Sequence, residues 1–322
     1  ALAKGVCKNI VNGGNKNIYD SKYAIQYYKE WIQSKPFDKG NTTVRTIGKL
    51  SHIEFNKNNV NDVLKTAAMK VNYESSFKHG NCANGSLMRI MPLSLYCLNI
   101  YDNNKIYNII KEDSALTHYN EYVFHINTIY TIAIKYLLHN YNELNKNINA
   151  INYCRYNYIN RQIKNNPNKY IKTVKKWFEK CFINVDDINS TVHLEPAKKG
   201  GFLKVAFQRA FFHLYHGRTV YDALYQTIRE GGDTDTNAAI VAGLLGCYHG
   251  LLNIHTPYVS NVYNCVPGPL SNHDRASRRV PFQPKLYIDD GLVKTILKYA
   301  PNDVQIACEN GKTSDTKDMD TK

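Results

Sequence analysis

The stretch YVFHINTIYTIAIKYLL, residues 122–138, decides the fold class of this chain. Its apolar residues recur three and four positions apart over about five turns, the spacing that places side chains on one face of an α-helix. They are Tyr122, Ile126, Ile129, Tyr130, Ala133, Leu137 and Leu138. The pattern predicts a long helix with one side buried.

The same helical spacing recurs elsewhere in the chain. It is found in residues 202–211 and in residues 87–91, after which Pro92 is expected to bend or interrupt a helix. Residues 235–248 are apolar nearly all round, which is typical of a central helix, and their small residues let neighbours approach closely. These small residues are Ala239, Ala242, Gly243 and Gly246. Since no segment alternates as a strand does, the sequence predicts an all-α protein, a single compact multi-helix bundle.

One helical domain is expected over residues 1–300, beginning with a helix at residues 1–11. Residues 140–152 are polar and rich in Asn, which predicts a surface loop or an insertion. Residues 255–284 carry five prolines and predict a long irregular segment. The polar tail at residues 301–322 has no aromatic residue and is expected to be disordered.

The composition excludes some classes of protein. No apolar run in the 322 residues approaches the roughly 20 residues that span a bilayer, which argues against an integral membrane protein. None of the eight cysteines forms a CxxC pair, so a reduced, cytoplasmic protein is expected. The net charge of +14 favours an acidic partner. Charge alone does not distinguish nucleic acid, anionic lipid and a phosphate-bearing small molecule.

The segment EGGDTDTN, residues 230–237, is the sharpest chemical motif. Two carboxylates one residue apart, with a hydroxyl beside them, are the hard oxygen ligands that Mg²⁺ and Mn²⁺ prefer. The paired glycines allow a sharp turn and a close approach to a ligand. Alternatively, Asp235 or Thr236 caps the following helix by accepting bonds from its first N–H groups. We favour the metal interpretation because carboxylates beside a buried helix need a partner.

Three other polar turns precede predicted helices. The segment GNCANGSLMR, residues 80–89, offers backbone N–H groups and a helix start, which can bind a phosphate; an ordinary capped turn is the alternative. The segment FDKGNTT, residues 37–43, is on its own a helix cap. The segment ALTH, residues 115–118, places His118 at the start of the long helix, where a structural role is the alternative to a functional one.

Residues 153–177 interleave basic residues with tyrosines. A basic groove with stacking aromatics can bind single-stranded nucleic acid. We favour a solvated helix face whose tyrosines lie in the core, so a nucleic-acid partner is not expected. The residues concerned are Tyr156, Tyr158, Tyr170, Arg155, Arg161, Lys164, Lys172, Lys175 and Lys176. A steep fall in affinity with added salt would favour the nucleic-acid alternative.

Taken together and in this order, the four polar motifs resemble those of the ADP-ribosylglycohydrolase family, which includes the dinitrogenase reductase-activating glycohydrolases. The resemblance runs from the first residues to about Gly250 and includes residues 238–243 after the carboxylate motif. It implies the all-α fold of that family and hydrolysis of an N- or O-glycosidic bond between ADP-ribose and a protein side chain or small acceptor. It also implies two Mg²⁺ or Mn²⁺ ions and a monomer whose partner is ADP-ribose or an ADP-ribosylated protein.

The resemblance also assigns roles to residues. Asp233, Asp235 and Thr236 are similar to the family's carboxy-terminal metal ligands, and the two aspartates are the implied catalytic residues. Contacts to the diphosphate or ribose are implied for Gly80, Asn81, Asn84, Gly85 and Ser86. The resemblance places His118 beside the nucleotide, and Gly40, Asn41 and Thr42 near the mouth of the cleft. Arg89 is either a residue of the cleft or a buried structural charge.

The sequence departs from the family pattern in one important respect. The family's Thr-Asp-Asp, which normally lies just before a helix such as residues 1–4, and its early Gly-Asp-Ala-Leu-Gly segment are absent from the sequence given. We therefore expect this chain to bind ADP-ribose weakly and to lack hydrolysis by itself. Smaller departures are Cys82, Ala83, Thr234 and Asn237. A non-catalytic ADP-ribose binder or a structural relative is the alternative function.

Overall fold

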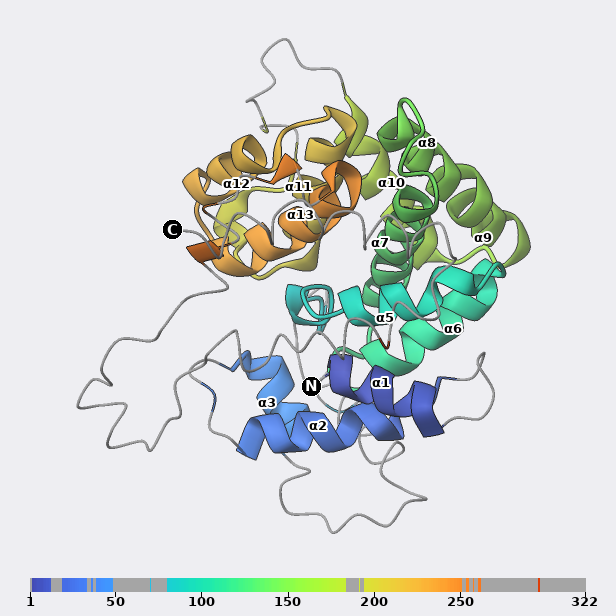
Figure 1. Ribbon diagram of the computed structural model, residues 1–322, viewed down its shortest axis with the longest axis vertical. Helices are drawn as coiled ribbons and strands as arrows, with labels where there is room; N and C mark the ends of the chain where they lie inside the picture. Colours follow the sequence, from blue (N-terminus) through green and yellow to red (C-terminus); the bar gives the residue numbers. More distant parts are fainter. Residues whose placement is uncertain are drawn as a thin grey trace, which may run out of the picture.

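A computed structural model describes residues 2–12, 19–33, 36, 39–48, 70, 80–183, 191, 194–250, 253–254, 257, 260–261 and 295 (Figure 1). Throughout these residues the regular structure is helical and no strand occurs. An isolated antiparallel bridge joins Ala83 to Phe202. The prediction of an all-α protein is confirmed.

The helices form groups that follow the order of the chain. In Figure 1, α1–α3 lie at the bottom, α5 and α6 lie above them, α7–α10 lie at the upper right and α11–α13 at the upper left. Their bounds are α1 Leu2–Asn12, α2 Lys22–Gln33, α3 Asn41–Ile47, η2 Asn84–Ser86, α5 Met91–Tyr96, η3 Cys97–Asn99, α6 Asn103–Ser114, α7 Glu121–His139, α8 Lys146–Cys154, η4 Arg155–Ile159, α9 Asn160–Asn165, α10 Lys169–Glu179, η5 Lys180–Phe182, η6 Ala197–Lys199, α11 Leu203–Tyr215, α12 Val220–Arg229 and α13 Thr234–His249. The predicted helices at residues 1–11, 122–138 and 202–211 are confirmed as α1, α7 and α11.

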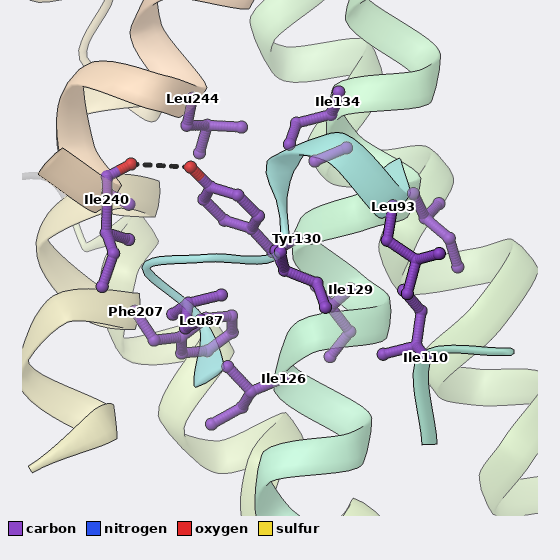
Figure 2. Close-up of a cluster of buried hydrophobic side chains, with 14 of the residues drawn as sticks. Leu87, Leu93, Ile110, Ile126, Ile129, Tyr130, Ile134, Phe207, Ile240 and Leu244 are labelled. Atoms are coloured by element: carbon purple, nitrogen blue, oxygen red, sulfur yellow. Dashed lines mark hydrogen bonds between the residues drawn. The ribbon is translucent and has the colours of Figure 1, made fainter. Parts of the chain in front are cut away.

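Helix α7 lies at the centre of the core, and its residues 123–135 are buried without a break, so the expectation that one side alone is buried is wrong. Its Tyr130 points at α13, where the hydroxyl donates a hydrogen bond of 2.8 Å to the carbonyl oxygen of Ile240 (Figure 2). A Cβ on Gly243 would lie only 2.7 Å from that hydroxyl and 3.0 Å from Cε of Met91. The expectation that small residues of this helix allow close approach is therefore confirmed at Gly243.

Helix α13 is less enclosed than the sequence suggested. Ile240, Val241, Leu244 and Leu245 are buried, whereas Ala239 on the opposite side is exposed. The expectation of a helix surrounded on every side is therefore wrong in that respect. Apolar residues on the outer face are small, so exposing them costs little.

Two further predictions are corrected by the structure. Residues 140–152 do not form one loop, because α8 begins at Lys146 after a turn in which Asn145 has φ 55°. The Asn-rich composition hides a helical spacing in which Asn147, Ala150 and Ile151 are buried. Pro92 does not bend a continuous helix but stands in the first turn of α5. The N–H groups of a first turn have no partner within the helix, so the missing N–H of proline breaks no helical hydrogen bond there.

Some predictions concern residues that lie mostly or wholly outside the described part. The irregular segment at 255–284 lies there except for isolated residues, and the tail at 301–322 lies there completely. Five of the six cysteines that the structure describes are buried. No described helix is both long enough and apolar enough to cross a membrane.

Three buried histidines make the stability of the fold sensitive to acid. Burial lowers the pKa of His118 to about 3, of His125 to about 4 and of His213 to about 3. In the unfolded chain each would take up a proton below about pH 6.5, so stability is retained above that pH and lost as the pH falls. We expect each histidine to lower the free energy of unfolding by about 1.4 kcal/mol between about pH 7.5 and about pH 5.5.

Urea unfolding at the two pH values measures this effect. The His213→Gln variant serves as the control, since it should lose one histidine's share of the pH dependence and keep the other two. An unfolding free energy that is the same at both pH values would contradict the prediction.

Candidate active site

The turn at residues 80–89 and the start of α13 meet at Asn84. The Asn84 side-chain amide donates hydrogen bonds to Oδ2 of Asp233 at 2.9 Å and to Oδ1 of Asn237 at 3.0 Å. Asn84 and Asn237 are 4% and 1% exposed, respectively, so these bonds are shielded from water. Two of the polar motifs, separated by 149 residues at this contact, therefore form one site.

Asp233 stands immediately before α13 but does not cap it, because its side chain accepts no hydrogen bond from the first N–H groups. Its carboxylate is thus available for another partner. Asp235 lies inside the helix and is exposed, and its Oδ1 accepts a hydrogen bond of 2.8 Å from the N–H of Thr236. The capping alternative therefore holds only for this one N–H group.

The two aspartates are close enough to interact. The Thr236 N–H and a hydrogen bond with Asp233 hold the pKa of Asp235 below its ordinary value. Asp235 is therefore ionised at neutral pH. Its exposed carboxylate places negative charge at the start of α13, beside the half-buried Asp233.

A third segment, residues 195–203, completes the site and was missed by the sequence analysis. The N–H of Asn84 donates to the carbonyl oxygen of Gly201 at 2.9 Å, and the N–H of Leu203 donates to that of Cys82 at 2.8 Å. A Cβ on Gly201 would lie 3.3 Å from Oδ2 of Asp233 and 3.5 Å from Oδ1 of Asn84. The doubled glycine at 200–201 is the signal that could have found it, since the carboxylate motif has the same feature.

A buried ion pair holds the third segment against the carboxylate motif. Arg209 of α11 is 3% exposed, and its Nε donates to Oε2 of Glu230 at 2.6 Å. Its second nitrogen donates to the carbonyl oxygen of Glu195 at 2.8 Å. Arg209 therefore binds both segments that flank Asp233.

Beneath the turn lies a layer of buried polar side chains. The amide of Asn127 on α7 donates to Oγ of Ser86 at 3.1 Å and to Oγ of Ser114 at 2.9 Å. Ser86 is fully buried, and Asn81 is 5% exposed. These side chains point into the protein and determine the shape of the turn, so their predicted contacts with a ligand stay predictions.

The structure decides between the two interpretations of Arg89. Its guanidinium forms an ion pair with the fully buried Asp113 and hydrogen bonds with the hydroxyls of Tyr28 and Thr117, the latter at 2.9 Å. Burial alone would lower the pKa of Arg89, but the Asp113 carboxylate raises it above its ordinary value. Arg89 is therefore a buried structural charge that lies beneath the turn.

His118 lies behind Gly85 and is 1% exposed. Its Nδ1 shares a hydrogen bond of 2.8 Å with Oγ1 of Thr117, and a Cβ on Gly85 would lie 3.2 Å from its Nε2. Because burial and the charge of Arg89 lower the pKa of His118 to about 3, the ring is neutral. The ring supports the turn from inside, and its predicted contact with a nucleotide stays a prediction.

The remaining predicted residues lie at the start of α3. Gly40 and Asn41 are exposed, and the helix has no side-chain cap at Gly40. Oγ1 of Thr43 would lie 4.0 Å from a Cβ on Gly85. The first turn of α3, which includes Thr42, thus borders the turn at residues 80–89.

Comparison with known proteins identifies the family of the chain. A family model described as ADP-ribosylglycohydrolase matches residues 1–280. The chain belongs to the ADP-ribosylglycohydrolase family. A protein of Acanthamoeba polyphaga mimivirus, named as a "putative ADP-ribosyl glycohydrolase", is 26% identical over 252 residues, which cover 77% of this chain and 69% of that protein.

Membership of the ADP-ribosylglycohydrolase family makes the chain a hydrolase of glycosyl bonds, as the motifs predicted. The metal ions implied by the resemblance can be tested only against the donor atoms present. Asp233, Asp235 and Thr236 offer two carboxylates and a hydroxyl, which suit a hard cation. Within the described ranges no three or more His, Cys, Asp and Glu side chains gather into a set that could hold a metal ion. The role of Asp233, Asp235 and Thr236 as metal ligands therefore stays a prediction.

Proposed function

We propose that the site at Asn84 and Asp233 binds ADP-ribose and hydrolyses the bond that links it to a protein side chain or a small acceptor. The observation that carries the proposal is the hydrogen bond of 2.9 Å from Asn84 to Asp233. It brings the turn that resembles a phosphate-binding segment beside the carboxylates that resemble metal ligands. Family membership supports the same reaction class.

Asp233, Asp235 and Thr236 would hold divalent cations, Mg²⁺ or Mn²⁺, as two ions in the complete site. When bound, such ions supply Lewis acidity and orient the ribose hydroxyls. The amide of Asn84 donates to Oδ2 of Asp233, so a bound cation would share that carboxylate with Asn84. Its second bond, to Asn237, holds this amide in one orientation.

The residues of the chain have defined tasks in the proposed reaction. Departure of the leaving group gives the sugar positive, oxocarbenium-like character, which nearby carboxylates stabilise. Asp233 and Asp235 provide that negative charge. Gly201 leaves the space beside Asp233 clear of a side chain, so a ribose could approach the carboxylate.

The test of the proposal is titration of ADP-ribose into the protein with and without Mg²⁺. Magnesium should tighten binding to the native chain, and Asp235→Asn should remove at least about tenfold of that gain because a cation ligand is lost. Asp222→Asn is the matched control, since Asp222 is likewise an aspartate in the first turn of a helix. Equal effects of the two substitutions would contradict the assignment.

Release of ADP-ribose from an ADP-ribosylated protein then separates the two candidate functions. Turnover that Asp235→Asn abolishes supports the hydrolase. Magnesium-dependent binding without turnover supports the non-catalytic binder.

A further inference from the structure

The positive charge of the protein is concentrated on one group of helices. Residues 146–180, which include α8, η4, α9, α10 and the first residue of η5, contain nine of the 41 Lys and Arg but one of the 27 Asp and Glu. That acid, Glu179, is bound by Arg155 at 2.9 Å. In Figure 1 these helices lie together at the upper right, on the other side of α7 from α12.

Six of these basic side chains are exposed and form a surface that we call the basic surface. None of them forms an ion pair with any residue that the structure describes. They are Arg161, Lys164, Lys169, Lys172, Lys176 and Lys180. Lys175 donates a hydrogen bond of 3.0 Å to Asn160, which ties α10 to α9 and keeps the two halves of the basic surface together.

Four lysines of α10 and of the turn that follows it are arranged in a line. Lys169, Lys172 and Lys176 of α10 and Lys180 of η5 follow one another three or four residues apart, which places them on one helix face over about 17 Å. The opposite face carries the buried Ile171, Val174 and Phe178. The helix therefore has a fixed rotation, and its outward face is a row of positive charges.

One aromatic side chain in this group of helices is exposed. Tyr156 lies in the π-helical turn η4 and is 61% exposed, whereas Tyr158 is fully buried and Tyr170 packs against Tyr122 at 4.9 Å. The expectation that the tyrosines of this stretch lie in the core is thus confirmed for Tyr158, whereas Tyr156 is left available for stacking.

We propose that the basic surface binds the phosphodiester backbone of a nucleic acid. A row of evenly spaced cations is complementary to evenly spaced phosphates, and an exposed tyrosine can stack on a base. A membrane surface fits less well, since a helix that lies in a lipid interface needs apolar side chains on its outward face. No large apolar side chain of α10 is exposed. The inference does not depend on the ADP-ribose site.

The experiment is anisotropy of labelled oligonucleotides of about 20 nucleotides, as single-stranded RNA, single-stranded DNA and duplex DNA. With six phosphate contacts, binding of a single strand should weaken by about 2.5 orders of magnitude between about 50 and 200 mM salt. The triple variant Lys172→Glu, Lys176→Glu and Lys180→Glu should lose about a hundredfold in affinity. The oligonucleotide that binds most tightly identifies the type of nucleic acid.

A second triple variant controls for net charge. Lys4, Lys105 and Arg229 are also exposed, and their replacement by Glu changes the charge equally at other places. Equal losses in both triple variants would overturn the proposal, as would failure of all three oligonucleotides to bind. Tighter binding of anionic lipid vesicles, or equally tight binding of polyglutamate, would also overturn it. Circular dichroism checks that both variants are folded.

Discussion

Replacing Gly232 with alanine is expected to lower the free energy of unfolding by about 4 kcal/mol and to weaken ADP-ribose binding. Gly232 has φ 79°, and a Cβ there would lie 2.1 Å from the carbonyl oxygen of Ala197. That oxygen belongs to the backbone, so the clash cannot be relieved by rotating a side chain. Either the third segment or the carboxylate turn must move, and Asp233 lies directly beside both.

Gly231 provides the matched control for this substitution. It has nearly the same φ, 78°, but a Cβ there would meet no atom within 4 Å. Gly231→Ala therefore carries only the cost of the left-handed conformation, about 1 kcal/mol. Chemical denaturation and ADP-ribose titration of both variants measure the difference. Equal destabilisation would mean that the contact with Ala197 has no energetic weight.

Replacing Arg89 with methionine is expected to cost about 3–5 kcal/mol, because it leaves the Asp113 carboxylate buried without its cation. Asp113 is fully buried and, among the described residues, would retain as side-chain donors the hydroxyls of Tyr19 and Tyr28, at 3.1 and 3.4 Å. Burial raises the pKa of both tyrosines, so both hydroxyls stay neutral and neither neutralises the negative charge of the carboxylate. The loss should become smaller at acid pH, where the uncompensated carboxyl is protonated.

Arg155→Met is the control, since Arg155 also pairs with a carboxylate at 2.9 Å but on the surface, where its partner Glu179 is 38% exposed. Exposed pairs contribute about 1 kcal/mol or less. The double variant Arg89→Met with Asp113→Asn should recover part of the stability. An Arg89→Met protein as stable as Arg155→Met would show that the buried pair does not hold the turn.

The fold could be predicted where apolar spacing was undisturbed, as in α7. It could not where composition concealed the spacing: residues 146–154 are rich in Asn, yet Asn147 is buried because its amide donates to the carbonyl of Leu214 at 3.0 Å. That partner belongs to a distant helix. The helix propensities of its own residues predict a loop for such a segment, because they take no account of a hydrogen bond to a residue far away in the sequence.

The candidate site was predictable only in part for a similar reason. The carboxylate motif and the 80–89 turn carry recognisable residues, but their meeting at Asn84 could be anticipated only through the family resemblance. The segment around Gly201 acts through backbone pairing with Cys82 and Asn84, which leaves little trace in its own residues. The ion pair between Arg89 and Asp113 also depends on tertiary contact. The sequence alone therefore could not decide whether Arg89 is a residue of the cleft or a structural charge.

The central claim is that Asn84 and Asp233 act together in one ADP-ribose site, and a double-mutant cycle tests it most directly. The affinity for ADP-ribose in Mg²⁺ would be measured for Asn84→Ala, Asp233→Ala, the double variant and the native chain. The hydrogen bond between the two side chains predicts a coupling of about 1–2 kcal/mol. Effects that add to within about 0.5 kcal/mol would contradict the claim and leave the two motifs as independent features of the fold.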